Sequence, residues 1–331
     1  MKAGVIGAGS WGSAFAYYLG RRNIPTRLWI REEDIFRDAQ KTRENRTFLP
    51  GFVFAPAVSF HHHFREVVDD SDVIFIAVPS QFCRKIYMEM APHLKKAQTV
   101  VSLTKGLEPK TLKRMSELME EAFRPQARPS LVVLSGPSFA KEVAEGHPTA
   151  LVAASRDADA ARRVQHFVSS RTIRVYASHD VIGVEIAGAL KNVIAIAAGI
   201  QDALAAANNS RASLITRGLA EITRMGVDMG AKKETFSGLA GVGDLLLTCT
   251  GELSRNHFVG LELGRGRTLK SILSGMKMVA EGVRTTLSAH HLAHLRGVEM
   301  PIAEQVYQVL YRSKAPEKAV EELMSRRLKN E

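Results

Sequence analysis

The chain has 331 residues, and its 45% hydrophobic and 24% charged content is typical of a soluble globular protein long enough for two hydrophobic cores. The formal charge of +11 favours anionic partners. Because the basic residues are dispersed and no aromatic-and-basic pattern accompanies them, the sequence argues against nucleic-acid binding and favours a small phosphorylated ligand. Its two cysteines, Cys83 and Cys249, exclude a disulfide framework and a thiolate metal site.

The first half of the chain alternates short apolar strands with helices, which predicts an α/β fold with a doubly wound parallel sheet. Helices are predicted over Trp11–Gly20, Gln81–Met90 and Thr111–Ala122. Ligands of such sheets bind at the carboxyl ends of the strands, so functional residues are expected there. The predicted strands are Lys2–Gly7, Thr26–Ile30, Asp72–Pro79, Thr99–Thr104, Leu131–Ser135, Ala150–Ala154 and Thr172–Tyr176.

From Val181 onwards the sequence contains helical patterns and no convincing strand. We therefore expect a dinucleotide-binding, Rossmann-like domain over residues 1–177 and an all-helical, substrate-binding domain over residues 178–331. The predicted helices of the second domain are Val181–Ala207, Ser213–Met229, Thr268–Leu273, Thr285–Arg296 and Pro301–Tyr311.

The most apolar stretch, Val181–Ala207, is the one candidate for a membrane span. It is interrupted by Glu185, Lys191, Asn192 and Asp202. Because charges at that depth in lipid are costly, we interpret the stretch as a buried helix. The apolar run after Lys2 breaks at glycines and does not resemble a signal peptide. The sequence thus predicts a cytoplasmic protein without membrane insertion.

A glycine-rich segment, Gly7-Ala8-Gly9-Ser10-Trp11-Gly12, follows the first predicted strand and opens a helix. In a dinucleotide-binding turn Gly7 permits the tight turn, Gly9 lets the backbone approach a pyrophosphate, and Gly12 allows helix and strand to pack closely. The helix then presents its N-terminal amides to the phosphate. The strand before, the helix after and the second strand at Thr26–Ile30 make a merely structural turn the weaker interpretation.

The end of the second predicted strand carries Arg31, where an NAD-specific protein usually has an acidic residue for the ribose hydroxyls. An arginine there can bind the 2′-phosphate of NADP, whereas Glu32 and Glu33 remain near for a free ribose. The sequence therefore predicts NADP as cofactor, with NAD also accepted. The alternative is an arginine that only faces solvent.

Two further segments follow predicted strands. Lys105 lies in Thr104-Lys105-Gly106, and Ser138 lies in Ser135-Gly136-Pro137-Ser138, just before a predicted helix start. Both segments belong at the ligand-binding edge of the sheet, where free amides and the Ser138 hydroxyl can hold an oxygen of a ligand. Each segment can also be plain turn chemistry.

Lys191, followed by Asn192, lies in the otherwise apolar stretch Ile186–Ile200. A lysine is costly to bury unless it is paired, and burial lowers its pKa toward the range useful for proton transfer. The alternative is a lysine whose ammonium reaches water along its aliphatic stem.

Glycines bracket a single acid in the segment Ser237–Thr248, which predicts a tight loop that delivers Asp244 to a site. A carboxylate beside Lys191 would orient that lysine. Downstream, Ser254-Arg255-Asn256 offers several donors, with an arginine that can fork onto a phosphate. The alternative is a helix N-cap followed by a surface arginine.

The histidines do not predict a metal site. His61-His62-His63 lies in a polar turn, and His290 and His294 are four residues apart on a predicted helix. No third ligand is evident for that pair in the sequence, so we expect no metal.

Nine segments, taken together, resemble one family. In chain order they are Gly7–Gly12, Leu49-Pro50-Gly51, Val78-Pro79-Ser80-Gln81, Leu103–Glu108, Ser135–Ser138, Leu190-Lys191-Asn192, Gly241–Leu245, Ser254-Arg255-Asn256 and Val279–Gly282. This order is similar to that of the NAD(P)-dependent sn-glycerol-3-phosphate dehydrogenases of bacterial type. The resemblance extends from Met1 to about Tyr311, and the segments of the second domain are more specific than the glycines of the first.

The resemblance implies roles for the matching residues. Lys191 accepts the proton when glycerol 3-phosphate is oxidised and donates it in reverse, Asp244 holds that lysine, and Lys105 polarises the carbonyl oxygen. The implied substrate positions are Lys105, Gly136, Ser138, Lys191, Asn192, Asp244, Ser254, Arg255 and Asn256. The implied cofactor positions are Gly7, Gly9, Ser10, Trp11, Gly12, Arg31, Lys105, Ala140, Arg255, Val279 and Glu281.

The implied reaction is a hydride transfer between NADPH or NADH and C2 of dihydroxyacetone phosphate, which yields sn-glycerol 3-phosphate for phospholipid synthesis. The resemblance also implies a homodimer.

Two other functions stay open from the sequence. One is a related two-domain dehydrogenase that acts on a hydroxy acid, and the other is a non-catalytic NAD(P)-binding sensor or nucleic-acid-binding protein. Ser254-Arg255-Asn256 argues against the first and Lys191 against the second.

Overall fold

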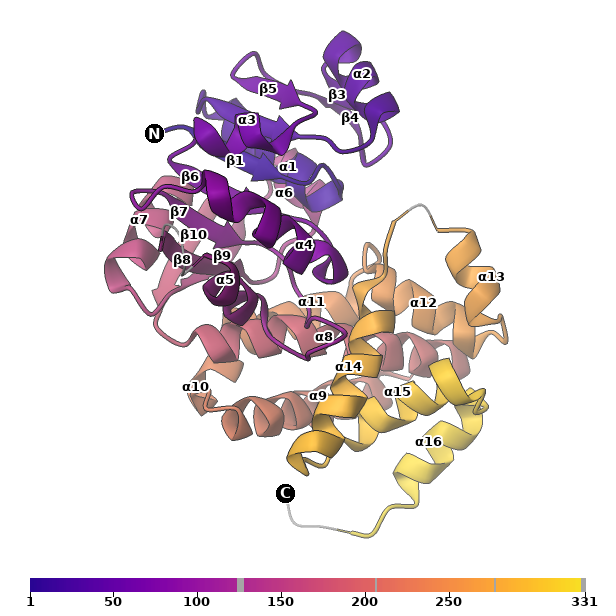
Figure 1. The fold of residues 1–331 in the computed structure, drawn as a ribbon. Helices are drawn as coiled ribbons and strands as arrows, with labels where there is room; N and C mark the ends of the chain where they lie inside the picture. The colour runs from indigo at the N-terminus through magenta and orange to yellow at the C-terminus, as the bar shows by residue number, and fades with distance from the viewer. Residues whose placement is uncertain (124–127, 206, 277, 329–331) are drawn as a thin grey trace. The chain divides into compact units, whose positions relative to one another are not determined.

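The computed structural model describes residues 1–331 except 124–127, 206, 277 and 329–331. The chain divides into two compact units (Figure 1). The first comprises Met1–Glu108 and Lys113–Glu185, and the second comprises Pro109–Leu112 and Ile186–Glu331. The boundary expected between residues 177 and 178 falls at the end of strand β10, and the observed division comes later in the chain, after Glu185.

Within the described part of the first unit, one sheet of eight strands has the order β10-β9-β8-β7-β6-β1-β2-β5. Strand β1 lies between β2 and β6 and is parallel to both, with Ala3 in register with Thr26 and with Val73. Such a central first strand marks the point at which an open sheet binds its ligand. The strands are β1 Ala3–Ile6, β2 Thr26–Trp29, β5 Val58–His61, β6 Val73–Ile76, β7 Thr99–Ser102, β8 Ser130–Ser135, β9 Thr149–Ala154 and β10 Ile173–Ser178.

The seven predicted strands are confirmed, but the expectation of a wholly parallel sheet is wrong at one place. Strand β9 runs antiparallel to β8, with Leu134 in register with Ala153. The connection between them holds only the short helix α6, Ala140–Glu145, which is followed by Gly146 with a φ of 86°. The chain therefore re-enters the sheet at the same edge where β8 ends, so β9 runs in the opposite direction to β8. An apolar run indicates burial on both faces of a sheet but carries no information about strand direction.

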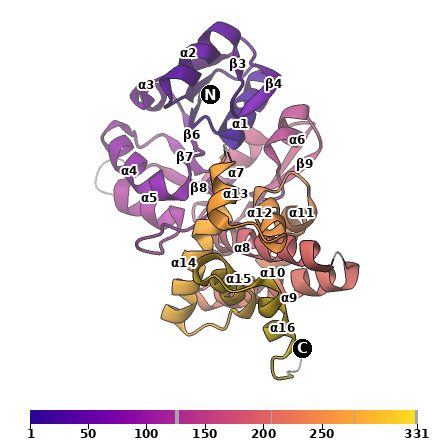
Figure 2. The same cartoon turned by 90° about the vertical axis from the view of Figure 1, so that its right-hand side faces the viewer.

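Helices cover both faces of the sheet, as the doubly wound prediction requires. Alternate residues of each strand serve the two faces, since Val5 and Phe75 pack with one group of helices and Ile6 and Ile76 with the other. Helices α4 and α5 lie side by side on the second face (Figure 2). The first face is covered by α1 Ser10–Arg21, α2 Glu33–Thr42, α6 and α7 Ala158–Val168, and the second by α3 Phe64–Asp69, α4 Ser80–Met90 and α5 Met115–Phe123.

Strand β5 and a small hairpin were not predicted. The hairpin pairs β3, Glu44–Asn45, with β4, Leu49–Val53, in antiparallel register. Both elements are short, and the hairpin strands contain a glycine, a proline and the charged Glu44, which weaken a strand pattern.

The described part of the second unit contains helices joined by loops and no strand, as predicted. One helix in the described chain, α8, is apolar and long enough over Val181–Leu204 to span a membrane, but 94% of that window is buried within the protein. Helix α8, Val181–Ala205, begins at the end of the first unit and continues into the second. The helices after it are α9 Asn208–Asp228, α10 Lys233–Phe236, α11 Asp244–Thr250, α12 Arg255–Gly264, α13 Leu269–Ser274, α14 Glu281–Arg296, α15 Pro301–Arg312 and α16 Pro316–Met324, with a π-helical turn over Leu239–Gly243.

Candidate active site

The glycine-rich turn joins β1 to α1 in the predicted way. Gly7 has a φ of 108°, and a Cβ atom on Gly12 would lie 1.9 Å from the Gly7 carbonyl oxygen, so only glycine allows this close packing. A Cβ atom on Gly9 would meet no heavy atom within 4 Å, which leaves open space at the helix N-terminus. Ser10 and Trp11 are the first residues of α1. The turn therefore offers backbone amides and space for a phosphate group.

Asn45 of strand β3 holds the glycine-rich turn and was missed by the sequence analysis. Its Nδ2 donates to the Ala8 carbonyl oxygen at 2.8 Å and to Ser13 Oγ at 2.9 Å, and its side chain is fully buried. Ser13 Oγ donates to the same Ala8 carbonyl at 3.0 Å. The hairpin thus holds the glycine-rich turn in place through the side chain of Asn45. The only signal in the sequence was the position of Asn45 shortly before the Leu49-Pro50-Gly51 segment.

Arg31 follows β2, at the carboxyl edge of the sheet. Its side chain is exposed, its Nε donates to Glu32 Oε1 at 3.0 Å, and its guanidinium lies 5.7 Å from the centre of the Phe82 ring. The arginine is therefore held near the surface by a neighbouring carboxylate and an aromatic ring.

Lys105 and Ser138 converge on one backbone oxygen. Lys105 Nζ donates to the Gly136 carbonyl at 2.9 Å, and Ser138 Oγ donates to the same oxygen at 3.0 Å. Gly136 has a φ of 132°, which favours glycine, and Ala140 begins the following helix. The ends of β7 and β8 are thus tied together at the carboxyl edge of β7, with an ammonium and a hydroxyl beside one another.

In the second unit, Lys191 is buried and paired. Its Nζ donates to Asp244 Oδ1 at 2.5 Å and to Thr248 Oγ1 at 2.6 Å, and all three side chains are buried. The alternative in which the ammonium reaches water is therefore wrong. Thr248 was not predicted as a site residue, although it lies one helical turn after Asp244, where i and i+4 side chains share a face.

Asp244 lies in a helix and not in the loop expected from its glycine neighbours. The π-helical turn Leu239–Gly243 runs directly into α11, and Asp244 is the first residue of that helix. A Cβ atom on Gly241 would lie 2.1 Å from the Phe236 carbonyl oxygen, so the glycine allows a close approach of the backbone. The glycines thus serve packing inside a helical turn, which places the carboxylate beside α8.

Cys249 follows Thr248 and is fully buried. Burial raises the pKa of its thiol to about 12. The thiol therefore stays neutral, as expected for a small core side chain.

Three helices meet through asparagine side chains. Asn256 Nδ2 donates to Asn192 Oδ1 at 2.9 Å, and Asn256 Oδ1 accepts a hydrogen bond of 2.9 Å from the backbone N–H of Gly282. These residues belong to α12, α8 and α14. Both asparagines are buried. The network fixes the start of α12 against α8, one residue from Lys191.

The crossing of α8 and α12 depends on two glycines. A Cβ atom on Gly199 would lie 2.0 Å from the His257 carbonyl oxygen, and one on Gly260 would lie 2.0 Å from the Ile196 carbonyl oxygen. The two backbones therefore touch at a distance that larger residues forbid. This contact sets the position of Ser254-Arg255-Asn256 relative to the helix that carries Lys191.

Sequence comparisons are consistent with both units. A sequence model described as NAD-dependent glycerol-3-phosphate dehydrogenase N-terminus matches residues 2–161, and the corresponding C-terminus model matches residues 180–321. The chain belongs to the NAD-dependent glycerol-3-phosphate dehydrogenase family.

Two relatives in the glycerol-3-phosphate dehydrogenase family are similar over their full length. The glycerol-3-phosphate dehydrogenase (NAD(P)+) of Syntrophobacter fumaroxidans is 50% identical over 328 residues, which cover 99% of this chain and 96% of the relative. That of Geobacter sulfurreducens is 50% identical over 330 residues, which cover 100% and 98%. The crystal structure of the Coxiella burnetii glycerol-3-phosphate dehydrogenase has a TM-score of 0.94 and 36% identity, and covers 98% of this chain and 99% of that one.

The remaining residues expected from the glycerol-3-phosphate dehydrogenase family lie at helix starts of the second unit. Ser254 is the N-cap of α12, where its Oγ accepts from the His257 backbone N–H at 3.2 Å, and Arg255 follows with an exposed side chain. The structure thus has the helix N-cap and surface arginine that the sequence offered as the alternative, and the exposed guanidinium is accessible to a ligand. Val279 is exposed, and Glu281 is the first residue of α14.

Proposed function

We propose that this chain is an NAD(P)-dependent sn-glycerol-3-phosphate dehydrogenase that interconverts dihydroxyacetone phosphate and sn-glycerol 3-phosphate. The observation that carries the proposal is the buried Lys191 ammonium, held by Asp244 and Thr248 at 2.5 and 2.6 Å. A sensor or a nucleic-acid-binding protein has no need of a titratable group in this setting. Family membership over both units supports the same activity.

Lys191 is the general acid–base group of the proposed reaction. Its ammonium gives a proton to the C2 oxygen during reduction and takes it back during oxidation. Asp244 and Thr248 both accept hydrogen bonds from its ammonium, which fixes the position of the lysine side chain. Asp244 and Thr248 therefore position the lysine.

The first unit binds the dinucleotide. The open space at Gly9 and the amides at the start of α1 suit a pyrophosphate, with Ser10, Trp11 and Ala140 beside it. Arg31 attracts the 2′-phosphate of NADP, and Glu32 and Glu33 lie near for the free ribose of NAD, so both dinucleotides are cofactors. When bound, the nicotinamide supplies the hydride. In the second unit Val279 and Glu281 contribute to cofactor binding.

Recognition of the substrate rests on charge and on hydrogen-bond donors. Lys105, fixed by the Gly136 carbonyl, polarises the C2 oxygen, and Ser138 lies beside it. Arg255 binds the phosphate, helped by Ser254 and by Asn256, whose position the contact with Asn192 sets. Phosphate binding far from the reacting carbon orients that carbon for hydride transfer.

The physiological part of the proposal rests on the resemblance. The enzyme works in the cytoplasm as a homodimer without nucleic-acid or membrane partners, and it reduces dihydroxyacetone phosphate for phospholipid synthesis.

Absorbance of NADPH and NADH at a fixed protein concentration tests the activity. We expect oxidation of both cofactors with dihydroxyacetone phosphate and little with unphosphorylated dihydroxyacetone or with a panel of 2-oxo acids. Turnover of a 2-oxo acid in preference to dihydroxyacetone phosphate would identify the related hydroxy-acid dehydrogenase instead. Cofactor binding without turnover of any ketone would support the sensor.

A further inference from the structure

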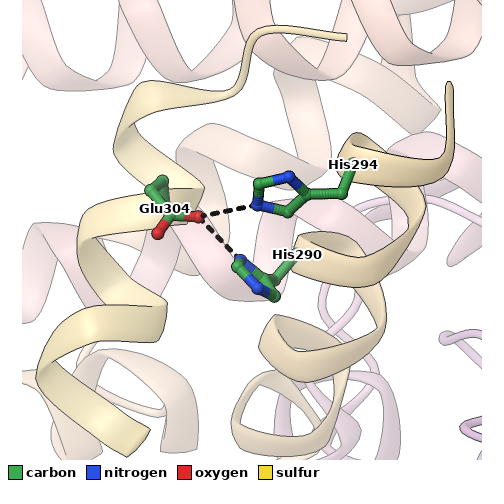
Figure 3. Close-up of side chains that lie close together, drawn as sticks. All are labelled: His290, His294 and Glu304. Carbon is green, nitrogen blue, oxygen red and sulfur yellow. Dashed lines mark hydrogen bonds and ion pairs between the residues drawn. The ribbon is translucent and has the colours of Figure 1, made fainter. Parts of the chain in front are cut away.

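Two histidines of α14 and one glutamate of α15 form a cluster that the proposed reaction does not use (Figure 3). His290 Nδ1 lies 2.7 Å from Glu304 Oε2, and His294 Nε2 lies 3.8 Å from the same oxygen. The candidate ligand atoms of the three residues all lie within 4.8 Å of one another. The i, i+4 spacing in the sequence shows the histidine pair but not a third ligand. The packing of α15 against α14 supplies it.

The distances suit a small cation after minor side-chain rotations. With metal–ligand bonds of about 2.0–2.1 Å and a tetrahedral angle, two ligand atoms of one ion lie about 3.3 Å apart. The His290–Glu304 distance must open from 2.7 Å, and the His294–Glu304 distance must close from 3.8 Å, to reach this value. Both changes are a fraction of an ångström. The distance between the two histidine nitrogens is at most 4.8 Å, and the exposed His294 ring can rotate to shorten it. The i, i+4 spacing already places both imidazoles on one face of α14.

Neighbouring residues orient the ligands in the way that metal sites require. Gln308 Nε2 donates to Glu304 Oε1 at 2.7 Å, which leaves Oε2 directed at the histidines. The ring of Tyr307 stacks on the His290 ring at 3.6 Å with an interplanar angle of 7°. Such outer partners fix the orientation of metal-bound histidines and carboxylates. His290 and Glu304 are thus held in place before any ion arrives.

Exposure and charge are favourable as well. The side chain of His290 is 15% exposed, whereas that of His294 is 70% exposed, so the cluster has one anchored face and one face open to water. Glu304 supplies a carboxylate oxygen beside both imidazoles, so the cluster combines two neutral ring donors with one acidic group.

We propose that His290, His294 and Glu304 form a binding site for a divalent transition-metal ion of the Zn²⁺ class, with water in the remaining positions. Two imidazoles and one carboxylate are donors that suit Zn²⁺, Ni²⁺ and Cu²⁺. Mg²⁺ and Ca²⁺ prefer all-oxygen sites and are excluded by this donor set. The ion links α14 to α15 and stabilises the contact between these two helices. The proposal does not depend on the proposed activity.

Zinc binding to the chelator-treated full-length protein tests the site, with a chromophoric competitor to measure affinity and elemental analysis to measure stoichiometry. The informative variant is His294→Ala, because an exposed side chain can be removed without disturbing the fold. His291→Ala is the matched control, since His291 is exposed on the same helix. We expect His294→Ala to lose one zinc equivalent or bind it at least about ten-fold more weakly, and His291→Ala to match the unchanged protein. Weak binding at His61-His62-His63 affects every variant equally.

Two further measurements distinguish a metal-binding site from a simple ion pair between α14 and α15. Gln308→Leu keeps all three ligands and removes only the outer hydrogen bond, so we expect zinc affinity to fall by about 10–100-fold. Zinc should raise the thermal midpoint of the unchanged protein but not of His294→Ala, and Mg²⁺ should raise neither. Equal zinc stoichiometry and affinity in the unchanged protein and in His294→Ala would overturn the proposal. It would leave the cluster as a His290–Glu304 contact alone.

Discussion

Lys191 and Asp244 are 53 residues apart in the chain, and their side chains form a hydrogen bond of 2.5 Å with almost no exposure to solvent. Lys191 lies on α8 and Asp244 on α11. A buried ammonium and carboxylate are costly to desolvate and become tolerable only through their mutual contact and added hydrogen bonds. Thr248 supplies one such bond at 2.6 Å. Each charge of the pair therefore needs the other for the stability of the fold, and the pair is also the centre of the proposed chemistry.

Lys191→Met should reduce kcat by about 10²–10⁴-fold, because methionine fits the apolar helix but carries no proton. Since Asp244 loses its ion pair with Lys191, the free energy of unfolding should also fall, typically by about 3–5 kcal/mol when a buried pair is broken. Denaturant unfolding and steady-state kinetics measure the two effects.

The double variant Lys191→Met/Asp244→Asn separates the effect on stability from the effect on catalysis. Removing the carboxylate charge should recover part of the lost stability, while turnover should stay low. A near-normal kcat in purified, folded Lys191→Met would exclude Lys191 as the proton carrier.

Arg255→Ala should lower kcat/KM for dihydroxyacetone phosphate by about ten- to hundred-fold, the range of a charge-assisted hydrogen bond worth roughly 1.5–3 kcal/mol. The side chain is exposed, so stability should hardly change. Arg265→Ala is a matched control, since Arg265 is exposed just after the end of the same helix and pairs with Glu262. An equal loss in both variants would mean that general charge, and not a specific phosphate contact, governs the affinity.

Arg31→Asp should shift cofactor preference toward NAD. The attraction for the 2′-phosphate is lost, and the new carboxylate repels that phosphate while it can accept hydrogen bonds from ribose hydroxyls. The change should appear as a raised KM for NADPH, because the contact lies far from the transferred hydride.

Arg37→Asp is the control for the Arg31 experiment, since Arg37 is exposed and pairs with Glu33 on α2. It should leave the ratio of kcat/KM for NADPH and NADH unchanged. The same unchanged ratio in Arg31→Asp would show that Arg31 only faces solvent and pairs with Glu32.

Glu221 makes stability depend on pH. Its buried carboxylate accepts hydrogen bonds from the backbone N–H groups of Ile302 at 2.7 Å and Ala303 at 3.2 Å, at the start of α15. Burial raises the pKa of Glu221 from 4.5 to about 7. A raised folded-state pKa means that the stabilising contribution is present below about pH 4.5 and is lost as the pH rises through about 7. A shift of this size corresponds to about 3 kcal/mol.

Glu221→Gln should therefore show a flatter dependence of unfolding free energy on pH between about 4.5 and 7 than the unchanged protein. Glu317→Gln removes the same charge at an exposed position of α16 and should leave the slope unchanged. Identical slopes for all three proteins in urea unfolding would mean that Glu221 keeps an ordinary pKa in the folded state.

Much of the first unit was determined by local sequence. The turn at Gly7–Gly12 requires residues without a Cβ atom, and the seven predicted strands are runs whose burial is encoded in their own side chains. The long apolar pattern from Val181 predicted α8, and the isolation of Lys191 within it predicted a partner for its charge. These features depend on periodicity and on backbone conformations that neighbouring residues set.

Contacts between distant segments were decided only by the tertiary structure. Asn45 and Thr248 have no local pattern that singles them out, yet they hold the glycine-rich turn and Lys191. The antiparallel direction of β9 is likewise not encoded in its apolar run. The same holds for Glu304, which completes the histidine pair of α14 from the neighbouring helix. A sequence states which side chains need partners, because burial and charge are local properties. Which partner each side chain meets depends on how helices and strands pack, and that is set by the whole core at once.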